Sequence, residues 1–64
     1  MTPATLKRIR QALGWSQQEM ADAIGVGRIA VARWETGTRR ISEPVARLVQ
    51  RIRAEARGKR RRKK

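Results

Sequence analysis

The sequence contains no cysteine and no histidine among its 64 residues. A disulfide framework and a thiolate zinc site are therefore excluded, and so is catalysis by imidazole. Tyrosine and phenylalanine are also absent, which leaves two tryptophans as the only aromatic side chains. A chain this short therefore depends on a small apolar core, in which each tryptophan can bury about 150–250 Å².

Acidic residues and long apolar runs are scarce as well. Five residues are Asp or Glu against seventeen Lys or Arg, and the formal net charge is +12. Small domains ordinarily carry a net charge of about 2–8, so this excess favours a polyanionic partner, with nucleic acid as the first candidate. No apolar segment approaches the length of about 18 residues that spans a bilayer, and no signal peptide follows Met1. We therefore expect a cytoplasmic, nucleoid-associated protein with no membrane partner.

Helical spacing of apolar residues runs through most of the chain and predicts an all-α fold. A first helix is expected over about residues 3–13, ended by Gly14. A second helix begins at the capping box of Ser16 and Glu19 and ends at Gly25. The third runs from Gly27 to Gly37 and the fourth begins at Ser42, whereas no alternation typical of a strand is present.

The short second and third helices predict a helix-turn-helix unit. Two helices joined by so tight a turn pack at a steep angle only where the facing residue is small and the turn holds a glycine, and Ala21 and Gly25 occupy those places. Val31 is expected to pack against Ala21, with Trp34 one turn further along the core. The shared stripe favours core packing over base stacking for Trp34, and Trp15 is assigned to the core as well.

The segment from Trp15 to Gly37 carries the specific pattern. In register, the chain contains Leu13-Gly14-Trp15-Ser16-Gln17-Gln18-Glu19-Met20-Ala21, Ile24-Gly25-Val26, Val31, Trp34-Glu35 and Gly37. This spacing resembles the phage-repressor and Cro-like helix-turn-helix proteins known as the XRE family, over about residues 6–52. The resemblance implies a compact lambda-repressor-like bundle of four or five helices, with the third helix lying in the major groove of DNA.

The resemblance also implies which side chains read DNA. Gln17, at the start of the second helix, matches a residue that contacts phosphate and supports the recognition side chains. Arg28, Ile29 and Arg33 match solvent-facing positions of the recognition helix. An Arg there can bond to O6 and N7 of guanine and Ile29 can contact a thymine methyl, so we expect a half-site that contains G and T.

The loop after the third helix resembles the basic loop that grips the DNA backbone in relatives. Thr38, Arg39 and Arg40 occupy it, and contacts of this kind set register without reading sequence. Arg10 and Glu35 match an ion pair of the family that joins the first helix to the third, and we expect it to position these helices without touching bases.

Gly27 and the C-terminal segment depart from the family pattern. The position of Gly27 is more often a Ser or Thr that can also bond a phosphate. Relatives commonly continue into a fifth helix or a dimerisation domain, whereas this chain ends in a basic segment, 57–64, that we expect to be disordered beyond a domain at 1–56. A nonspecific DNA clamp, an RNA-binding arm and an end without a role are the alternatives for this segment, and the clamp is favoured.

These features together predict a repressor, acting on its own gene, that binds double-stranded DNA at an inverted repeat as a homodimer and derives from a phage or mobile element. No cofactor, metal or catalytic residue is expected, because no base or phosphate-cradling loop accompanies Ser and Glu. One alternative is an antitoxin whose fourth helix also covers a toxin. Another is a nonspecific nucleic-acid-binding protein; a membrane-active peptide is opposed by the clustering of charge in loops and tail. The fourth helix carries a stripe that serves either the core or a second subunit: Val45, Leu48, Val49 and Ile52.

Overall fold

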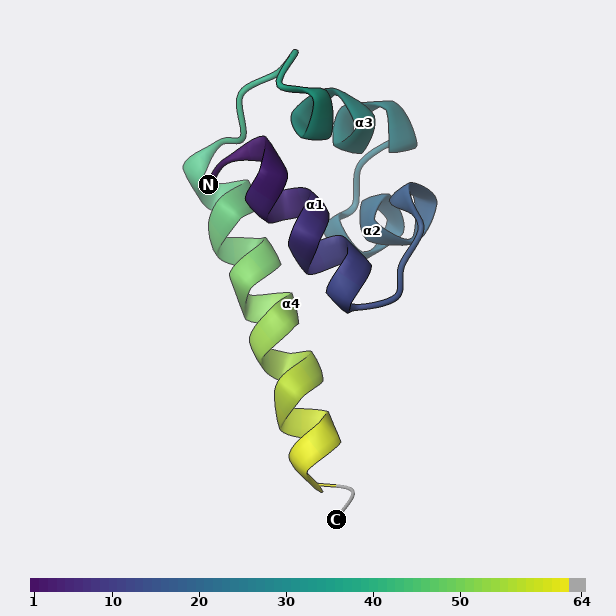
Figure 1. The fold of residues 1–64 in the computed structure, drawn as a ribbon, viewed down its shortest axis with the longest axis vertical. Coiled ribbons are helices and arrows are strands. Elements are labelled where there is room, and N and C mark those ends of the chain that lie inside the picture. The colour runs from purple at the N-terminus through teal and green to yellow at the C-terminus, as the bar shows by residue number, and fades with distance from the viewer. Residues whose placement is uncertain (63–64) are drawn as a thin grey trace.

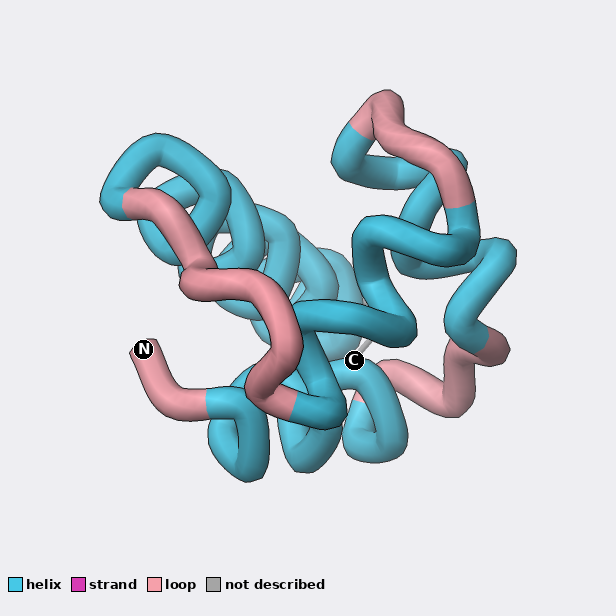
Figure 2. The backbone as a smooth tube through the Cα atoms, turned by 90° about the horizontal axis from the view of Figure 1, so that it is seen from above, coloured by secondary structure: helices cyan, strands magenta, loops and turns pink. Residues whose placement is uncertain are grey.

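Four helices make up most of the structure, a computed structural model that describes the backbone of residues 1–62 and the side chains of residues 1–57. Their bounds are α1 Pro3–Ala12, α2 Gln17–Ile24, α3 Arg28–Thr36 and α4 Glu43–Arg62. Only short loops separate the helices, and no strand occurs in the described part of the chain (Figure 2). The predicted all-α fold of four helices is confirmed over residues 1–62.

Local hydrogen bonds fix both ends of α1. Thr2 caps its N-terminus, because the Thr2 side-chain oxygen accepts from the Thr5 amide at 3.1 Å. The C-terminus ends at Ala12, one residue earlier than expected, in a Schellman motif. There the Gly14 amide donates to the Gln11 carbonyl, and the Trp15 amide donates to the Arg10 carbonyl. Gly14 has a φ of +73°, which explains why a glycine occupies that position.

The capping box predicted for α2 is present in full. The Glu19 amide donates to the Ser16 hydroxyl at 3.1 Å, and the Ser16 amide donates to the Glu19 carboxylate at 2.8 Å. At the other end, Gly25 adopts a φ of +90° and ends the helix as predicted. Gly27 then begins α3 with no side-chain cap, so this helix lacks the bond that a Ser or Thr would supply.

The core consists of small and medium apolar side chains from all four helices, together with one tryptophan. The buried residues are Leu6, Ile9, Met20, Ala21, Val31, Trp34, Ala46 and Val49. Val31 and Ala21 belong to one cluster, as the steep packing of α2 and α3 requires, and Trp34 is buried in it as predicted. Trp15 is half-buried and packs against the outside of this cluster.

Among the described side chains of α4, the buried ones lie in the first half of the helix. Of its predicted stripe, Val49 is fully buried and Val45 packs against the core, whereas Leu48 and Ile52 stay half-buried. The helix is twenty residues long, about 30 Å at 1.5 Å per residue, and its C-terminal part projects past the ends of the other helices (Figure 1). The molecule is consequently elongated, with extents of 40 × 20 × 19 Å.

The backbone of the projecting part of α4 is helical beyond Ala56, whereas the disorder expected for residues 57–64 stays a prediction. Helical backbone continues through Arg62, and only residues 63–64 of the basic segment lie outside the described residues. Arg and Lys are good helix formers, and a single glycine, Gly58, costs a helix only about 1 kcal/mol relative to alanine. Local propensity therefore extends a helix that tertiary packing has already started.

Candidate DNA interface

α3 lies across one end of the molecule, with α1 and α2 beneath it (Figure 1). Its inner face contributes Val31 and Trp34 to the core, so the opposite face points to solvent. Gly37 ends the helix with a φ of +82°. A helix of nine residues that is buried on one face and exposed to solvent on the other meets the requirements of the predicted major-groove contact.

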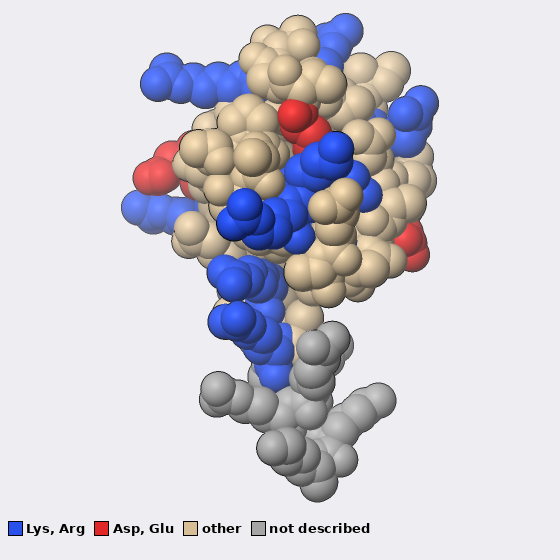
Figure 3. Space-filling model, viewed as in Figure 1, with Lys and Arg blue, Asp and Glu red and all other residues tan. Residues whose placement is uncertain are grey.

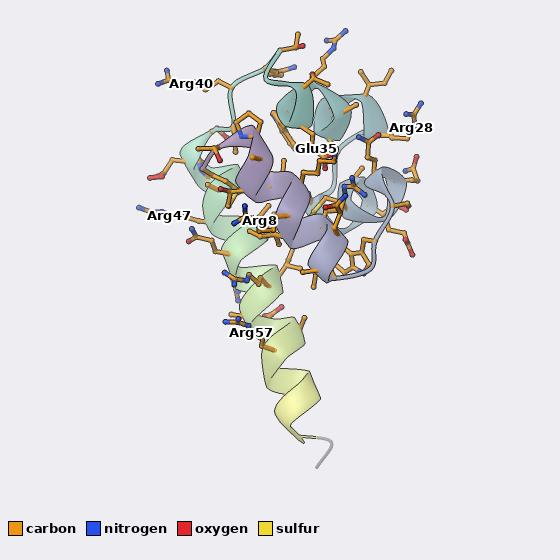
Figure 4. The ribbon with its side chains drawn as sticks, in the orientation of Figure 1. Arg8, Arg28, Glu35, Arg40, Arg47 and Arg57 are labelled. Carbon is orange, nitrogen blue, oxygen red and sulfur yellow. The ribbon has the colours of Figure 1, made fainter. Side chains whose placement is uncertain are left out.

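The outer face of α3 begins with two exposed side chains. Arg28 extends away from the body of the protein at the first residue of the helix (Figure 4), and Ile29 next to it is 59% exposed. Arg33, one turn later, is also exposed, while Ala32 is half-buried. The structure therefore brings Arg28, Ile29 and Arg33 together on one solvent-facing surface.

The loop that follows α3 continues this surface. Thr38, Arg39 and Arg40 are all exposed, and in Figure 4 Arg40 projects from the loop on the side away from Arg28. The Arg39 amide donates to the Arg33 carbonyl at 3.2 Å, which holds the loop against the end of α3. Cationic groups thus lie along the helix and beyond its C-terminal end.

A network centred on Glu35 holds α3 to the other helices. The Glu35 side chain is only 4% exposed, and its carboxylate accepts from the Arg10 guanidinium at 2.6 and 3.1 Å. The third guanidinium nitrogen of Arg10 donates to the Trp15 carbonyl at 2.8 Å, and the side-chain amide of Gln17 donates to the Glu35 carboxylate at 3.2 Å. This network therefore ties α1, the loop after it and the first residue of α2 to the recognition helix. A forked Arg–carboxylate pair of this kind fixes geometry as well as charge.

The outer face of α3 and the loop after it offer cationic hydrogen-bond donors and one exposed apolar side chain. Within residues 1–57, no group of three His, Cys, Asp or Glu lies close enough to hold a metal ion. No helix among the described residues is both long and apolar enough to cross a bilayer. The surface is suited to binding an anionic, grooved partner.

Comparison with known families decides the class of protein. The model of a helix-turn-helix family, HTH_3, matches residues 6–52, from the buried face of α1 into the middle of α4. This chain belongs to the XRE family of helix-turn-helix proteins. Comparisons with curated proteins and with solved structures gave no significant match. Because the XRE family consists of DNA-binding transcriptional regulators, this member is a DNA-binding transcriptional regulator.

The XRE-family chain keeps most of its predicted contact residues at the surface, with one exception. Gln17 is half-buried, and its amide is bonded to Glu35. This hydrogen bond supports α3. The resemblance implies such a supporting role for Gln17, besides a contact with phosphate. Sequence reasoning missed the bond from Arg10 to the Trp15 carbonyl, because no local pattern indicates which backbone carbonyl a long side chain reaches after folding.

Proposed function

We propose that the protein is a sequence-specific repressor that binds an inverted repeat in duplex DNA as a homodimer. The observation that carries this proposal is Ile29, an apolar side chain 59% exposed in the first turn of α3. Ile29 belongs neither to the core nor to the apolar residues packed against it, so it has no role in the packing. Between Arg28 and Arg33 it is suited to a thymine methyl, while either arginine can form two bonds to guanine.

Phosphate contacts on both sides of α3 would set the register. On one side, Gln17 retains a second amide hydrogen beyond the one it gives Glu35, and the backbone N–H groups that open α2 point the same way as the helix dipole. On the other side, Thr38, Arg39 and Arg40 supply exposed donors. Gly27 permits close approach, because nothing lies within 4 Å of the position where its Cβ would be.

The small size of the outer face of α3 supports the proposal of a homodimer. One short helix covers a single half-site, and useful specificity ordinarily requires two half-sites about one helical turn apart. Leu48 and Ile52, half-buried on α4, provide apolar area for a second copy. Occupancy of the operator by such a dimer on the nucleoid would exclude other proteins from the site and so repress transcription.

The test compares two single-charge variants. Full-length protein, Arg28→Ala and Arg47→Ala are titrated against DNA from upstream of their own gene and against a scrambled duplex of equal length, near physiological salt. Arg47 is the matched control, because it is equally exposed but projects from α4, away from α3 (Figure 4).

We expect the parent and Arg47→Ala to prefer the upstream DNA by about two orders of magnitude or more, and Arg28→Ala to lose that preference. Equal binding of both duplexes by the parent would replace the repressor proposal with nonspecific binding driven by charge.

A further inference from the structure

Most of the positive charge lies away from the recognition helix. Of the seventeen Lys and Arg, four belong to α3 and the loop after it, and Arg10 is paired with Glu35. Twelve therefore remain in α1, in α4 and at the C-terminus. Blue side chains run from α1 down along the projecting part of α4 (Figure 3). The operator contacts proposed above make no use of this charge.

The inner face of α4 changes from apolar to basic where the helix projects beyond the other helices. Ala46 and Val49 are buried on this face, and the same helical spacing places Arg53 and then Arg57 on it one and two turns later. Both arginines line a groove of about 330 Å³ between α4 and the end of α1, opposite Leu13 and Trp15. Their methylene stems can therefore lie along apolar surface while the guanidinium groups stay in water.

Arg53 and Arg57 form an uncompensated pair. Like charges four residues apart on a helix repel each other. On the other flank of α4, Arg51 has Glu55 at 3.7 Å, but among the described residues neither Arg53 nor Arg57 has an acidic partner. Arg8 of α1 faces the same side of the molecule (Figure 4). An anionic partner with charges at close intervals would relieve this repulsion, and duplex DNA carries one charge per about 1.7 Å of its axis.

We propose that Arg8, Arg53 and Arg57, here termed the α1/α4 cationic face, bind the backbone of a second DNA duplex without sequence preference. Arg57 lies on the projecting part of α4, at the other end of the molecule from Arg28 and Arg40 (Figure 4). DNA is stiff over about 150 base pairs, so a short duplex on α3 does not bend round to the far end of α4. Each protomer therefore bridges two DNA segments, one read by α3 and one held by charge.

A capture assay tests this proposal. A duplex from upstream of the gene is immobilised on beads, full-length protein is added, and a fluorescent random-sequence duplex is then captured from solution. The variant is Arg8→Gln/Arg53→Gln/Arg57→Gln. We expect it to bind the immobilised duplex as the parent does, but to capture the second duplex at least about tenfold less, because each charge-assisted bond lost weakens binding by about an order of magnitude.

The control variant removes the same charge from other surfaces of the same two helices. It is Lys7→Gln/Arg47→Gln/Arg51→Gln, with one change in α1 and two in α4 at the same spacing, and all of its side chains are exposed. Capture should fall much less than in the first variant. Replacement of Arg8, Arg53 and Arg57 by lysine should restore most of the capture, and binding of the glutamine variant to the immobilised duplex shows that this variant is folded.

Equal loss of capture in the glutamine variant and its control would overturn the proposal, because bulk charge would then account for it. A parallel loss of binding to the immobilised duplex would overturn it as well, since the cationic face would then contact the same DNA as α3. The repressor proposal is judged separately, by the sequence preference of Arg28→Ala, so the two can fail independently.

Discussion

The position of α3 depends on the carboxylate of Glu35. It is nearly buried and receives hydrogen bonds from Arg10 and Gln17, whereas Arg10 itself is 13% exposed. Removing one partner of a buried pair leaves a charge without compensation, which costs far more than an exposed pair contributes. A change at Glu35 or Arg10 should therefore alter DNA binding through the placement of α3, although neither side chain lies on the exposed outer face of that helix.

Two arginine-to-alanine variants should separate the buried from the exposed ion pair. We expect Arg10→Ala to lower the free energy of unfolding by about 3 kcal/mol or more, because Glu35 is left buried and unpaired. Arg51→Ala should lower it by less than about 0.5 kcal/mol, because Arg51 and Glu55 are 77% and 64% exposed. Urea unfolding followed by tryptophan fluorescence measures both values, and similar midpoints for the two variants would contradict this assignment.

At the scale of elements, two glycines of one turn have different roles. Gly25 ends α2 with a φ of +90°, a conformation that costs other residues about 1–2 kcal/mol, whereas Gly27 begins α3 with a φ of −80°. The turn therefore requires only the first glycine. Serine at the second would supply the missing cap of the recognition helix.

The same substitution at these two positions should have opposite effects. Gly25→Ser is expected to lower the free energy of unfolding by about 1–2 kcal/mol. Gly27→Ser should raise it by about 0.5 kcal/mol, through the new cap and the reduced freedom of the unfolded chain. Thermal unfolding by circular dichroism reports both. A shift of the same sign in the two variants would show that backbone conformation is not what distinguishes them.

The elements predictable from sequence are those fixed by local chemistry. The Ser16 and Glu19 capping box, the ends of α2 and α3 at Gly25 and Gly37, and the buried spacing of Val31 and Trp34 all follow from residues within one or two turns. The length of α4 was not predicted in the same way. From Arg57 onward its sequence has no apolar side chain, so hydrophobic periodicity carries no information there.

In the candidate site, too, the features fixed by nearby residues could be predicted from the sequence, whereas the contacts between distant residues could not. The exposure of Arg28, Ile29 and Arg33 could be predicted, because Val31 and Trp34 at helical spacing assign the opposite face of the helix to the core. The bond between Gln17 and Glu35 joins residues 18 apart in sequence and depends on how α2 and α3 pack. A contact of this kind depends on tertiary packing and produces no periodic pattern in the amino-acid sequence.

On the scale of the whole molecule, we predict that the fold does not depend on the basic segment. Every buried side chain among the described residues lies between Leu6 and Val49. We expect a chain that ends at Ala56 to keep its free energy of unfolding within about 0.5 kcal/mol of the parent, as for surface changes in general. Its far-ultraviolet circular dichroism should still weaken, since residues 57–62 are helical. A loss of several kcal/mol would show that the end of α4 contributes to the core.

The two faces of α3 are under different constraints. On the inner face, Val31 and Trp34 pack in the core and stabilise the fold. On the outer face, the side chains are exposed and do not belong to the core: Arg28, Ile29 and Arg33. Mutations on the outer face can therefore accumulate without a stability penalty, and a duplicated copy of the gene could acquire a new operator by a few substitutions. In such a lineage the recognition specificity evolves quickly on a scaffold that hardly changes.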